Sequence, residues 1–399
     1  MVQYLHATDE QKEYADVART ILEKELLPII EQQEHADEGR GAYPMEVHQK
    51  MAEAGFFGMN IPEEWGGLGL DVVTQALIAE EMAKIDAGFT FSFYNAGTFF
   101  PMILASGLSK EEKQEWADGI VAGEKIGCFC ITESEAGSDV TAMKTKAVKD
   151  GDEWVINGVK CFASNGPIAN YFLVAAWTDR SAGASKGITF FLVEKDRGVE
   201  VGKKETKMGL KLSETSDVIF NDVRVPEDHV IGEIGKGLKY SLDLISNEGR
   251  AVGMSFNLGL AEAALDKAVE YAKERRQFGK RIIDHEGLSF MIADMKARTE
   301  ASRGLLYYTL SALRDGKNIG TMGSICKMYI SDCTMQTTTD AVQVLGGYGY
   351  MKDYPVEKYM RDAKIFQIFS GTNQIQKRTI TRALAGRDPQ AVRKNKQKG

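Results

Sequence analysis

The stretches Tyr171-Phe-Leu-Val-Ala-Ala-Trp177 and Ile188-Thr-Phe-Phe-Leu-Val193 decide the fold class. Both are short runs rich in aromatic and aliphatic residues, and a segment containing Gly-Ala-Ser separates them, which is typical of neighbouring β-strands. Similar runs begin at Trp154 and at Val218, near Asp-Gly and Asn-Gly turns. The period of two over this part of the chain predicts a middle β domain, a barrel or a sandwich, over residues 125–237.

The segments on either side of this domain have helical periodicity. Apolar residues recur at steps of three and four before it and again after it. These patterns predict an N-terminal helical domain over residues 1–124 and a C-terminal helical bundle over residues 238–385. Residues 386–399 are rich in Lys, Arg and Gln, which predicts a flexible tail. The predicted fold class is therefore α+β and multidomain, with helices, a β domain and helices in that order.

The composition argues against several classes of protein. A net charge of −8 on 399 residues is unlike a nucleic-acid-binding protein, which normally presents a basic face. No apolar run reaches the ~20 residues that span a bilayer, and the first residues show neither a signal peptide nor a transit peptide. Five cysteines without framework spacing fit a reducing compartment, so the cytoplasm is the predicted location. Cys128 and Cys130 could form half of a metal site, but their alternation in a predicted strand favours two buried side chains and no metal.

Two motifs at the start of the β domain could meet a flat ring system. Cys130-Ile-Thr132-Glu-Ser-Glu-Ala-Gly137-Ser138-Asp139 offers hydroxyls and backbone N–H groups at a strand end. Gly158-Val-Lys160-Cys-Phe162-Ala-Ser164-Asn165-Gly166 places an aromatic ring two residues before a hydroxyl, so that one could stack on a ring while the other binds its edge. Taken alone, each motif is explained more simply as an ordinary structural turn.

Three further motifs lie in the C-terminal part. Glu274-Arg-Arg-Gln-Phe-Gly-Lys280 brings two arginines to a helix end, where guanidinium groups suit a pyrophosphate, although a solvated basic face explains it equally well. Gln343-Val-Leu-Gly-Gly-Tyr-Gly-Tyr350 and the segment 361–375, which contains Phe369-Ser-Gly-Thr372, carry glycines that let a backbone approach a ligand closely. Neither has the glycine spacing of a dinucleotide-binding fingerprint or a P-loop.

Together, the order and spacing of these five motifs and the helix–β–helix layout resemble the acyl-CoA dehydrogenases, from Asp9 to Ala385. The resemblance implies an FAD-dependent oxidoreductase that acts on the CH–CH group of an acyl-CoA. It also implies that FAD lies between the β domain and the C-terminal helices. The family usually has tryptophan where Phe162 stands. The residues implied at the flavin ring are Phe129, Ile131, Thr132, Phe162 and Ser164.

The resemblance implies further contacts for the distal part of FAD and for CoA. A neighbouring subunit would hold the pyrophosphate and adenine through Arg275, Gln277, Phe278, Gln343, Gly346 and Gly347. Thr372 and Gln374 would contact the adenosine portion. The positions that usually meet CoA are Ser138, Asn247 and Arg250. Because subunits share cofactors in this family, the implied state is a homotetramer, and the implied redox partner is an electron-transfer flavoprotein.

The residue before the Gly371-Thr372 pair is unusual for this family. Most members have a glutamate there, which removes the proton α to the thioester while hydride leaves the β carbon. This chain has Ser370, and a serine hydroxyl without an activating partner is a poor base. The backbone N–H of residue 370, which normally polarises the thioester carbonyl, is retained with any residue except proline.

A minority of the family carries the glutamate on a helix, directly before the arginine that corresponds to Arg250. Here that residue is Gly249. Glu248 is displaced by one position, which turns a helical side chain by about 100°. A capping or solvated role for Glu248 is therefore a simpler interpretation than a relocated base.

The segment 89–100 corresponds to the helix that lines the acyl pocket in the family. It contains six aromatic residues, which cannot all face one way on a helix, so most are expected in the core. Tyr94 and Asn95 fall closest to the pocket floor and, with Phe369 and Gly371, form the predicted acyl site. These residues favour a short, bulky or cyclic acyl group, and Tyr94 is the predicted substitute proton acceptor.

The sequence thus predicts an acyl-CoA dehydrogenase whose substrate does not need a carboxylate at position 370. One alternative is a lyase of the same fold that releases a sulfur leaving group from an acyl-CoA without redox chemistry. Others are a reductase that runs in the opposite direction and a flavin- or acyl-CoA-binding protein without catalysis. An engineered exchange of glutamate for serine at position 370 would give the same sequence.

Overall fold

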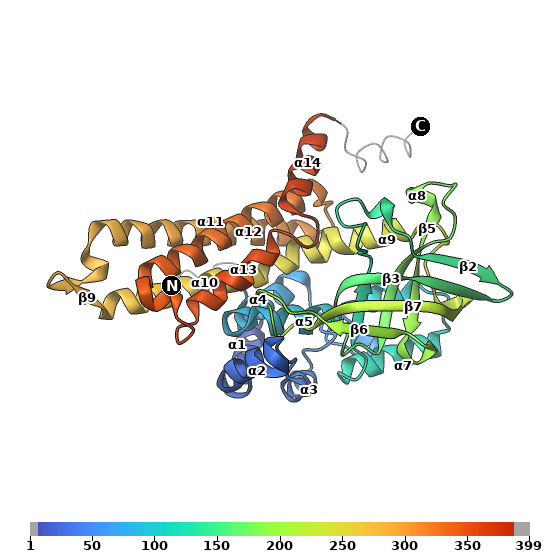
Figure 1. Cartoon of the computed structure of the whole chain (residues 1–399), viewed down its shortest axis with the longest axis horizontal. Helices are drawn as coiled ribbons and strands as arrows, with labels where there is room; N and C mark the ends of the chain where they lie inside the picture. Colours follow the sequence, from blue (N-terminus) through green and yellow to red (C-terminus); the bar gives the residue numbers. More distant parts are fainter. Residues whose placement is uncertain (1–6, 387–399) are drawn as a thin grey trace.

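The computed structural model describes residues 7–386, except for the side chains at 242, 243 and 246–248. Helices form both ends of this range and a sheet forms its middle, which confirms the predicted α+β fold class. Figure 1 shows the sheet at one end of the molecule and the long C-terminal helices reaching away from it. The predicted tail from residue 387 onward lies outside the described residues. Within the described range, no helix has the length and apolar character needed to cross a membrane.

The N-terminal part consists of helices around α4 (Val72–Ile85), which is buried along most of its length. Polar side chains fix where several of these helices begin. Thr8 and Ser109 form capping boxes, and the carboxylate of Asp86 accepts a hydrogen bond from the backbone N–H of Phe89 (2.7 Å), which caps α5. The other helices are α1 (Asp9–Glu25), α2 (Ile30–Gly39), α3 (Met45–Glu53), α5 (Ala87–Gly97), α6 (Phe100–Leu104) and α7 (Lys110–Val121).

The middle part is an eight-stranded sheet with the strand order β6-β7-β3-β2-β4-β5-β8, in which β1 pairs in parallel with β4. The four apolar runs predicted as strands fall in β3, β4, β5 and β7. The strands are β1 (Gly127–Cys130), β2 (Lys146–Asp150), β3 (Glu153–Ser164), β4 (Tyr171–Trp177), β5 (Ile188–Glu194), β6 (Glu200–Lys204), β7 (Thr215–Pro226) and β8 (Val230–Ile231).

β4 departs from the predicted alternation, because all seven of its residues are buried. Leu173 and Ala175 pack in the core that the sheet shares with the helices. Phe172 and Val174 pack in a second core formed by the strands alone. A strand with apolar neighbours on both faces has a continuous apolar run in place of an alternating one. β4 therefore packs against the helices with one face and against the rest of the sheet's core with the other.

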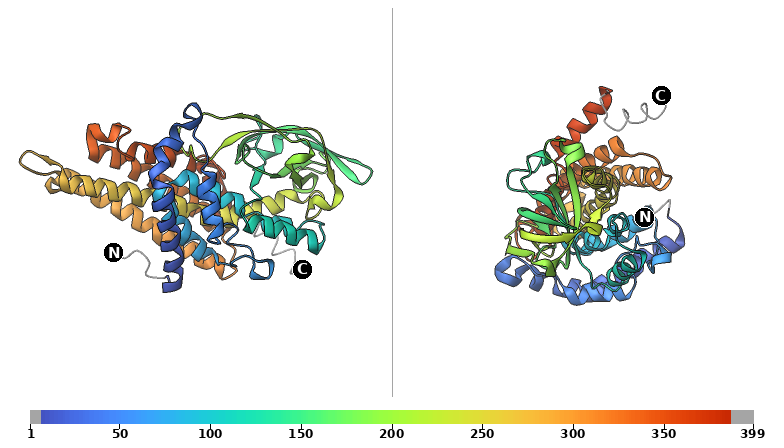
Figure 2. Two further views of the ribbon diagram at one scale, coloured as in Figure 1. Left: turned by 90° about the horizontal axis from the view of Figure 1, so that it is seen from below. Right: turned by 90° about the vertical axis from the view of Figure 1, so that its right-hand side faces the viewer.

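The C-terminal part is a set of long helices interrupted by a π-helix at Ile245–Val252. π-helical turns are rare and occur often at functional sites. The helices are α9 (Gly237–Leu244), α10 (Gly253–Glu274), α11 (Glu286–Arg314), α12 (Gly320–Leu345), α13 (Val356–Phe366) and α14 (Asn373–Leu384). A hairpin of β9 (Arg276–Gln277) and β10 (Lys280–Arg281) joins α10 to α11. Figures 1 and 2 both show this hairpin at the end of the helices remote from the sheet.

The predicted domain boundaries fall close to breaks between elements. α7 ends at Val121 and β1 begins at Gly127, on either side of the boundary predicted after residue 124. α9 begins at Gly237, where the second boundary is predicted. Because helices and sheet share one apolar core, the placement of these boundaries stays a prediction.

A buried ammonium group joins the three parts of the chain. Nζ of Lys358 in α13 lies 2.5 Å from Asp362 Oδ2 and 2.7 Å from Asp86 Oδ2. The other oxygen of Asp362 accepts a hydrogen bond from the backbone N–H of Leu210 (2.6 Å), which lies between β6 and β7. Burial opposes the charged form, but Asp362 and Asp86 outweigh it and raise the pKa of Lys358 well above its usual range. The cluster therefore holds α5, α13 and the β domain together.

His48 of α3 is buried against the N-terminal helices. Tyr43 Oη lies 2.9 Å from its Nδ1, and the carbonyl oxygen of Gly123 lies 3.0 Å from its Nε2. Burial lowers the pKa of His48 to about 4, whereas a histidine in an unfolded chain titrates near ~6.5. The neutral ring is therefore part of the folded state.

We expect this histidine to make the fold less stable as the pH falls. Between these two pKa values the unfolded chain binds a proton at His48 and the folded chain does not, so stability is full above pH ~6.5 and decreases below it. From pH 7.5 to pH 5.0 the wild type should lose about 2 kcal/mol more free energy of unfolding than a His48→Gln variant. Urea unfolding followed by circular dichroism measures both losses. His35→Gln, at an exposed position, is the control, and equal losses in wild type and His48→Gln would contradict this expectation.

Candidate functional site

The ends of β1 and β3 bring the first two motifs together. The carbonyl of Thr132 accepts a hydrogen bond from the backbone N–H of Cys161 (2.9 Å). The next residue, Phe162, has a φ of 55° and is 68% exposed. A left-handed conformation is rare for an aromatic residue, and such strain clusters at functional sites. The predicted flavin-ring residues Ile131, Thr132, Phe162 and Ser164 therefore lie on adjacent strand ends, half-buried or exposed.

Phe129, the fifth predicted flavin-ring residue, is more closely tied to the core. Its ring stacks on Phe99, with 5.9 Å between ring centroids, and on Phe190, at 5.3 Å. The side chain thus anchors the end of β1 from behind, and it remains only half-buried.

A buried ion pair lies directly behind these strand ends. Lys160 Nζ is 2.8 Å from Glu133 Oε1 and 3.3 Å from the carbonyl oxygen of Ile131. Glu133 also accepts hydrogen bonds from the backbone N–H groups of Lys144 (2.6 Å) and Thr145 (3.1 Å). The sequence motif gave no role for Lys160, although a lysine within a strand of apolar neighbours indicates a buried ion pair. The pair fixes the turn after β1 relative to β3.

The loop between α13 and α14 carries the unusual serine. Ser370 has a φ of 53° and Gly371 a φ of 87°, so both residues are left-handed. Gly249 of the π-helix borders this loop, since a Cβ at position 249 would lie 3.9 Å from Ser370 Oγ. The two positions at which a carboxylate was considered therefore face the same space, and neither has an acidic side chain.

Two basic side chains lie near this loop. Arg250 Nη2 is 3.7 Å from the place that a Cβ at Gly371 would occupy, and burial lowers the pKa of Arg250. Burial, followed by the proximity of Arg250, lowers the pKa of Lys327 in α12 to about 7. The side chains of Asn247 and Glu248, which the sequence analysis also considered, lie outside the described residues.

An aromatic cluster borders the loop on the side of α5. Phe91 stacks on Phe369, with ring centroids 4.9 Å apart and planes inclined by 26°, and meets Phe256 of α10 edge-on. Tyr94 packs against Phe256, and its hydroxyl donates a hydrogen bond to Gln75 Oε1 (2.9 Å). As it stands, Tyr94 is a hydrogen-bond donor, and its use as a proton acceptor stays a prediction.

The rest of the predicted acyl-pocket segment serves mainly the core, as expected. Phe89 and Phe93 stack on each other and are fully buried. Asn95 is half-buried and donates to the carbonyl of Phe91 one turn earlier (2.7 Å). Phe91 was not singled out from the sequence, although it lies one helical turn before Tyr94 on the same face, which was the available signal.

The residues predicted to hold the distal part of FAD lie at the other end of the molecule. Phe278, at the tip of the β9–β10 hairpin, is 93% exposed with a φ of 51°. The guanidinium of Arg275 lies 5.8 Å from the ring centroid of Tyr348. In Figures 1 and 2 this hairpin is far from β3, so one chain does not bring the two sets of residues together. The distal set comprises Arg275, Gln277, Phe278, Gln343, Gly346 and Gly347, all exposed.

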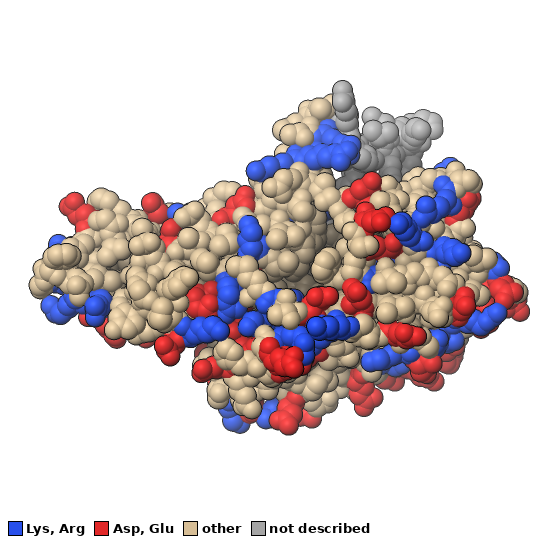
Figure 3. Space-filling model, viewed as in Figure 1, with Lys and Arg blue, Asp and Glu red and all other residues tan. Residues whose placement is uncertain are grey.

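The remaining predicted residues lie near α14 or in exposed turns. Thr372 caps α14 by accepting a hydrogen bond from the backbone N–H of Ile375 (3.3 Å), and Gln374 is exposed on its first turn. Ser138 is exposed in the turn after β1. Figure 3 shows a hollow below α14, with mostly uncharged side chains at its visible wall.

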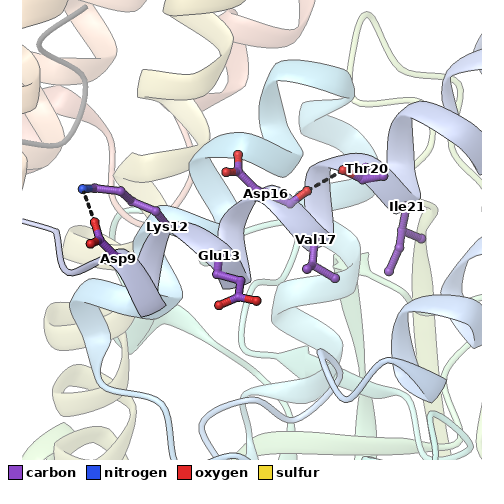
Figure 4. A pocket seen from close by; sticks show the side chains of 7 residues that line it. All are labelled: Asp9, Lys12, Glu13, Asp16, Val17, Thr20 and Ile21. Atoms are coloured by element: carbon purple, nitrogen blue, oxygen red, sulfur yellow. Dashed lines mark hydrogen bonds and ion pairs between the residues drawn. The ribbon is translucent and has the colours of Figure 1, made fainter.

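Two other features lie apart from this region. Cys128 and Cys130 are buried side by side with their sulfurs 3.7 Å apart. Among the side chains that the structure describes, no cluster of His, Cys, Asp and Glu is arranged to hold a metal ion. A hollow of about 470 Å³ on the outer face of α1 is lined by residues of that helix alone, including Asp9 paired with Lys12 (Figure 4). None of the predicted site residues borders it.

The described residues form two separate groups, one suited to the flavin ring of FAD and the other to its pyrophosphate. The exposed ring of Phe162 beside the hydroxyls of Thr132 and Ser164 suits a flat, polar-edged ring system. At the far end, a Cβ at Gly346 or Gly347 would meet no other atom within 4 Å, which leaves room for a pyrophosphate beside an arginine.

Comparison with known proteins gives matches over nearly the whole chain. The acyl-CoA dehydrogenase N-terminal, middle and C-terminal domain families match residues 8–124, 128–223 and 235–385. An acyl-CoA dehydrogenase of Bacillus subtilis is 39% identical over 385 residues, which is 96% of this chain and 100% of that protein. The caffeyl-CoA reductase-Etf complex subunit CarC of Acetobacterium woodii is 38% identical over 384 residues, 95% of this chain and 99% of that protein.

A solved structure agrees with these matches. Butyryl-CoA dehydrogenase from Megasphaera elsdenii superimposes with a TM-score of 0.90 and 38% identity, covering 95% of this chain and 99% of that one. Sequence and fold thus agree over all three parts. The chain therefore belongs to the acyl-CoA dehydrogenase family, whose members are FAD-dependent flavoproteins, and it is an oxidoreductase that acts on the CH–CH group of an acyl-CoA.

Proposed function

We propose that this enzyme dehydrogenates a short, bulky or cyclic acyl group carried as a CoA thioester, with the proton accepted elsewhere than at position 370. The observation that carries the proposal is the approach of Gly249 to Ser370, since a Cβ at 249 would lie 3.9 Å from the serine oxygen. These are the two positions from which a glutamate is expected to act in this family. Here both are uncharged.

The reaction divides into two tasks. FAD, when bound, accepts a hydride from the β carbon. The chain's own residues must bind the thioester and remove a proton. Among the described side chains, none forms a hydrogen bond with the Ser370 hydroxyl, so none of them activates it as a base. Loss of a positioned base costs about 10²–10⁴-fold in rate. A ring substrate avoids this loss only where a base elsewhere takes the proton from another ring carbon, and Tyr94 is the proposed acceptor.

The aromatic cluster supports the choice of acyl group. Phe91 stacked on Phe369 places two flat rings immediately before Ser370, and Phe256 meets Phe91 from the side of α10. Flat rings offer a large apolar surface to a bulky or cyclic group. Three aromatic side chains in this place also leave less room for a long straight chain.

A relative supports the redox partner and gives a second candidate function. CarC of Acetobacterium woodii is named as a subunit of a caffeyl-CoA reductase-Etf complex, and a caffeyl group contains an aromatic ring. We therefore take an electron-transfer flavoprotein as the partner. The second candidate is a reductase, in which the same site transfers the hydride in the opposite direction.

The cofactor is proposed to be shared between subunits of a homotetramer. The β9–β10 hairpin lies at the end of the molecule remote from β3, the strand that carries Phe162, so a site with both halves needs a second chain. Phe278, 93% exposed at the hairpin tip, is an aromatic surface that a neighbouring subunit would cover. The proposed location is the cytoplasm, where the five free cysteines would stay reduced.

Restoring a carboxylate at either position should create ordinary α,β-dehydrogenase activity. Ser370→Glu supplies the missing base directly, and Gly249→Glu supplies it from across the same space, where a Cβ makes only ordinary contacts. Each variant should bleach its flavin with butyryl-CoA about 10²–10⁴-fold faster than the wild type. Stopped-flow absorbance of the FAD-loaded protein measures the rate.

The matched controls are Ser370→Gln and Gly249→Gln, which have the same size and shape but no basic oxygen. If the glutamine variants reduce the flavin as fast as the glutamate variants, the gain is not due to a base. If neither glutamate variant gains activity on straight-chain thioesters, the assignment of position 370 as the place of the usual base is wrong.

Sharing of FAD between subunits predicts complementation between two defective variants. Phe162→Ala/Ser164→Ala damages one half of the proposed site, and Arg275→Ala/Phe278→Ala damages the other. Each variant alone should purify with little FAD. Co-expressed with different affinity tags, mixed oligomers should contain sites in which both halves are intact and should retain FAD measurable by absorbance. Mixed oligomers with no more FAD than the parents would contradict the shared site.

A further inference from the structure

The buried side chain of Gln376 holds the backbone of the serine loop. Its Nε2 donates hydrogen bonds to the carbonyl oxygens of Ser370 (3.2 Å) and Gly371 (2.9 Å). Gln376 is 0% exposed, so water does not compete for these contacts. An amide nitrogen has two N–H groups, and the two carbonyls use both. The opposite orientation of the amide would place its oxygen against two carbonyl oxygens, so the contacts determine which way it points.

These contacts coincide with the strained part of the loop. Ser370, with a φ of 53°, is in a conformation that costs a residue other than glycine free energy, so surrounding contacts must maintain it. Gly371 fits the same constraint, because a Cβ there would lie 2.8 Å from Gln376 Nε2. The φ of 87° at position 371 favours glycine there, and Gln376 holds the carbonyl of residue 370 in place.

A second set of contacts anchors the end of the loop to α12. Lys327 Nζ donates to Asn373 Oδ1 (2.7 Å), and Asn373 Nδ2 donates to Asp332 Oδ1 (2.7 Å). The backbone N–H of Asn373 closes the loop onto the carbonyl of Gln367 (3.0 Å). With both ends of the loop fixed in this way, Gln376 determines the conformation of its middle.

Fixing the carbonyls also orients the N–H groups of the loop. In a trans peptide the C=O and the following N–H point in opposite directions, so the N–H groups of Gly371 and Thr372 point away from Gln376. The φ of 53° at Ser370 determines how the N–H of this residue is turned relative to the rest of the loop. Within the described residues, no group accepts a hydrogen bond from the N–H of Ser370 or Gly371. The loop therefore offers the free N–H of Gly371 on the side opposite Gln376, and the N–H of Ser370 beside it is also free.

We infer that Gln376 is the positioning residue for the thioester carbonyl. It acts through the loop: by holding the carbonyl oxygens of residues 370 and 371, it directs the free backbone N–H groups toward the place where negative charge develops on the thioester oxygen. This inference rests on the proposed function in placing that oxygen at residue 370. It also gives the site a means of stabilising an enolate that does not depend on a carboxylate.

The test reads the carbonyl directly. Acetyl-CoA labelled with ¹³C at its carbonyl has no β carbon and cannot be dehydrogenated, so it reports binding alone. Isotope-edited infrared spectroscopy of the FAD-loaded protein should show its carbonyl stretch at lower frequency when it is bound to the wild type. Gln376→Met removes both donors at similar size, and Gln376→Asn keeps the amide but is one methylene too short. In both variants most of the frequency shift should be lost, and flavin bleaching by an active thioester should slow by about tenfold to hundredfold.

The control is Lys377→Met, at the next, exposed position of α14, which should keep the full shift. FAD content and circular dichroism establish that each variant is folded, and Gln376→Asn, the smaller change, remains informative if Gln376→Met does not fold. A full carbonyl shift in a folded Gln376 variant would overturn the inference, as would the absence of a shift in the wild type. A shift in the wild type without bleaching by any acyl thioester would instead overturn the proposed function and leave the role of Gln376 standing.

Discussion

The structure depends on the buried ammonium group of Lys358. It bridges Asp86 and Asp362, and each of these carboxylates has a second role: Asp86 caps α5, and Asp362 holds the backbone of Leu210 in the β domain. Removing one member of such a buried pair typically costs about 3–5 kcal/mol, because a charge is left without its partner. Helices and sheet are therefore fixed relative to one another at a point from which both walls of the candidate site extend.

The site follows from that arrangement. α5 leads from Asp86 to Phe91, and α13 leads from Lys358 to the loop that carries Phe369. The ion pair between Asp86 and Lys358 therefore helps to position the two rings that stack beside Ser370. The π-helix brings Gly249 close to the hydroxyl of Ser370, and Gln376 holds the backbone of the loop through its carbonyl groups. The loop thus keeps free backbone donors, while positions 249 and 370, which lie close to each other, both lack a carboxylate.

Part of this could be predicted from residue patterns. The strands β3, β4, β5 and β7 follow from compact aromatic and aliphatic runs, and the motifs around Thr132 and Phe162 do lie side by side. The contacts that depend on packing between distant segments could not be predicted. The π-helix has no distinctive pattern of residues, the Lys160–Glu133 pair joins positions in separate elements, and Gln376 looks like any polar residue on a first helical turn. The sequence could not show that Phe91 stacks on Phe369 whereas Tyr94 packs against Phe256, because these contacts depend on the neighbours of α5.

The central claim is that the enzyme oxidises a thioester without a carboxylate at position 370. Anaerobic titration of the FAD-loaded wild type with two sets of thioesters tests it most directly, one set of straight-chain acyl-CoAs and one of alicyclic acyl-CoAs, with flavin absorbance as the signal. We expect bleaching by a ring thioester and little or none by a straight-chain one. Rapid bleaching by a straight-chain acyl-CoA, or conversion of a thioester without any bleaching, would contradict it.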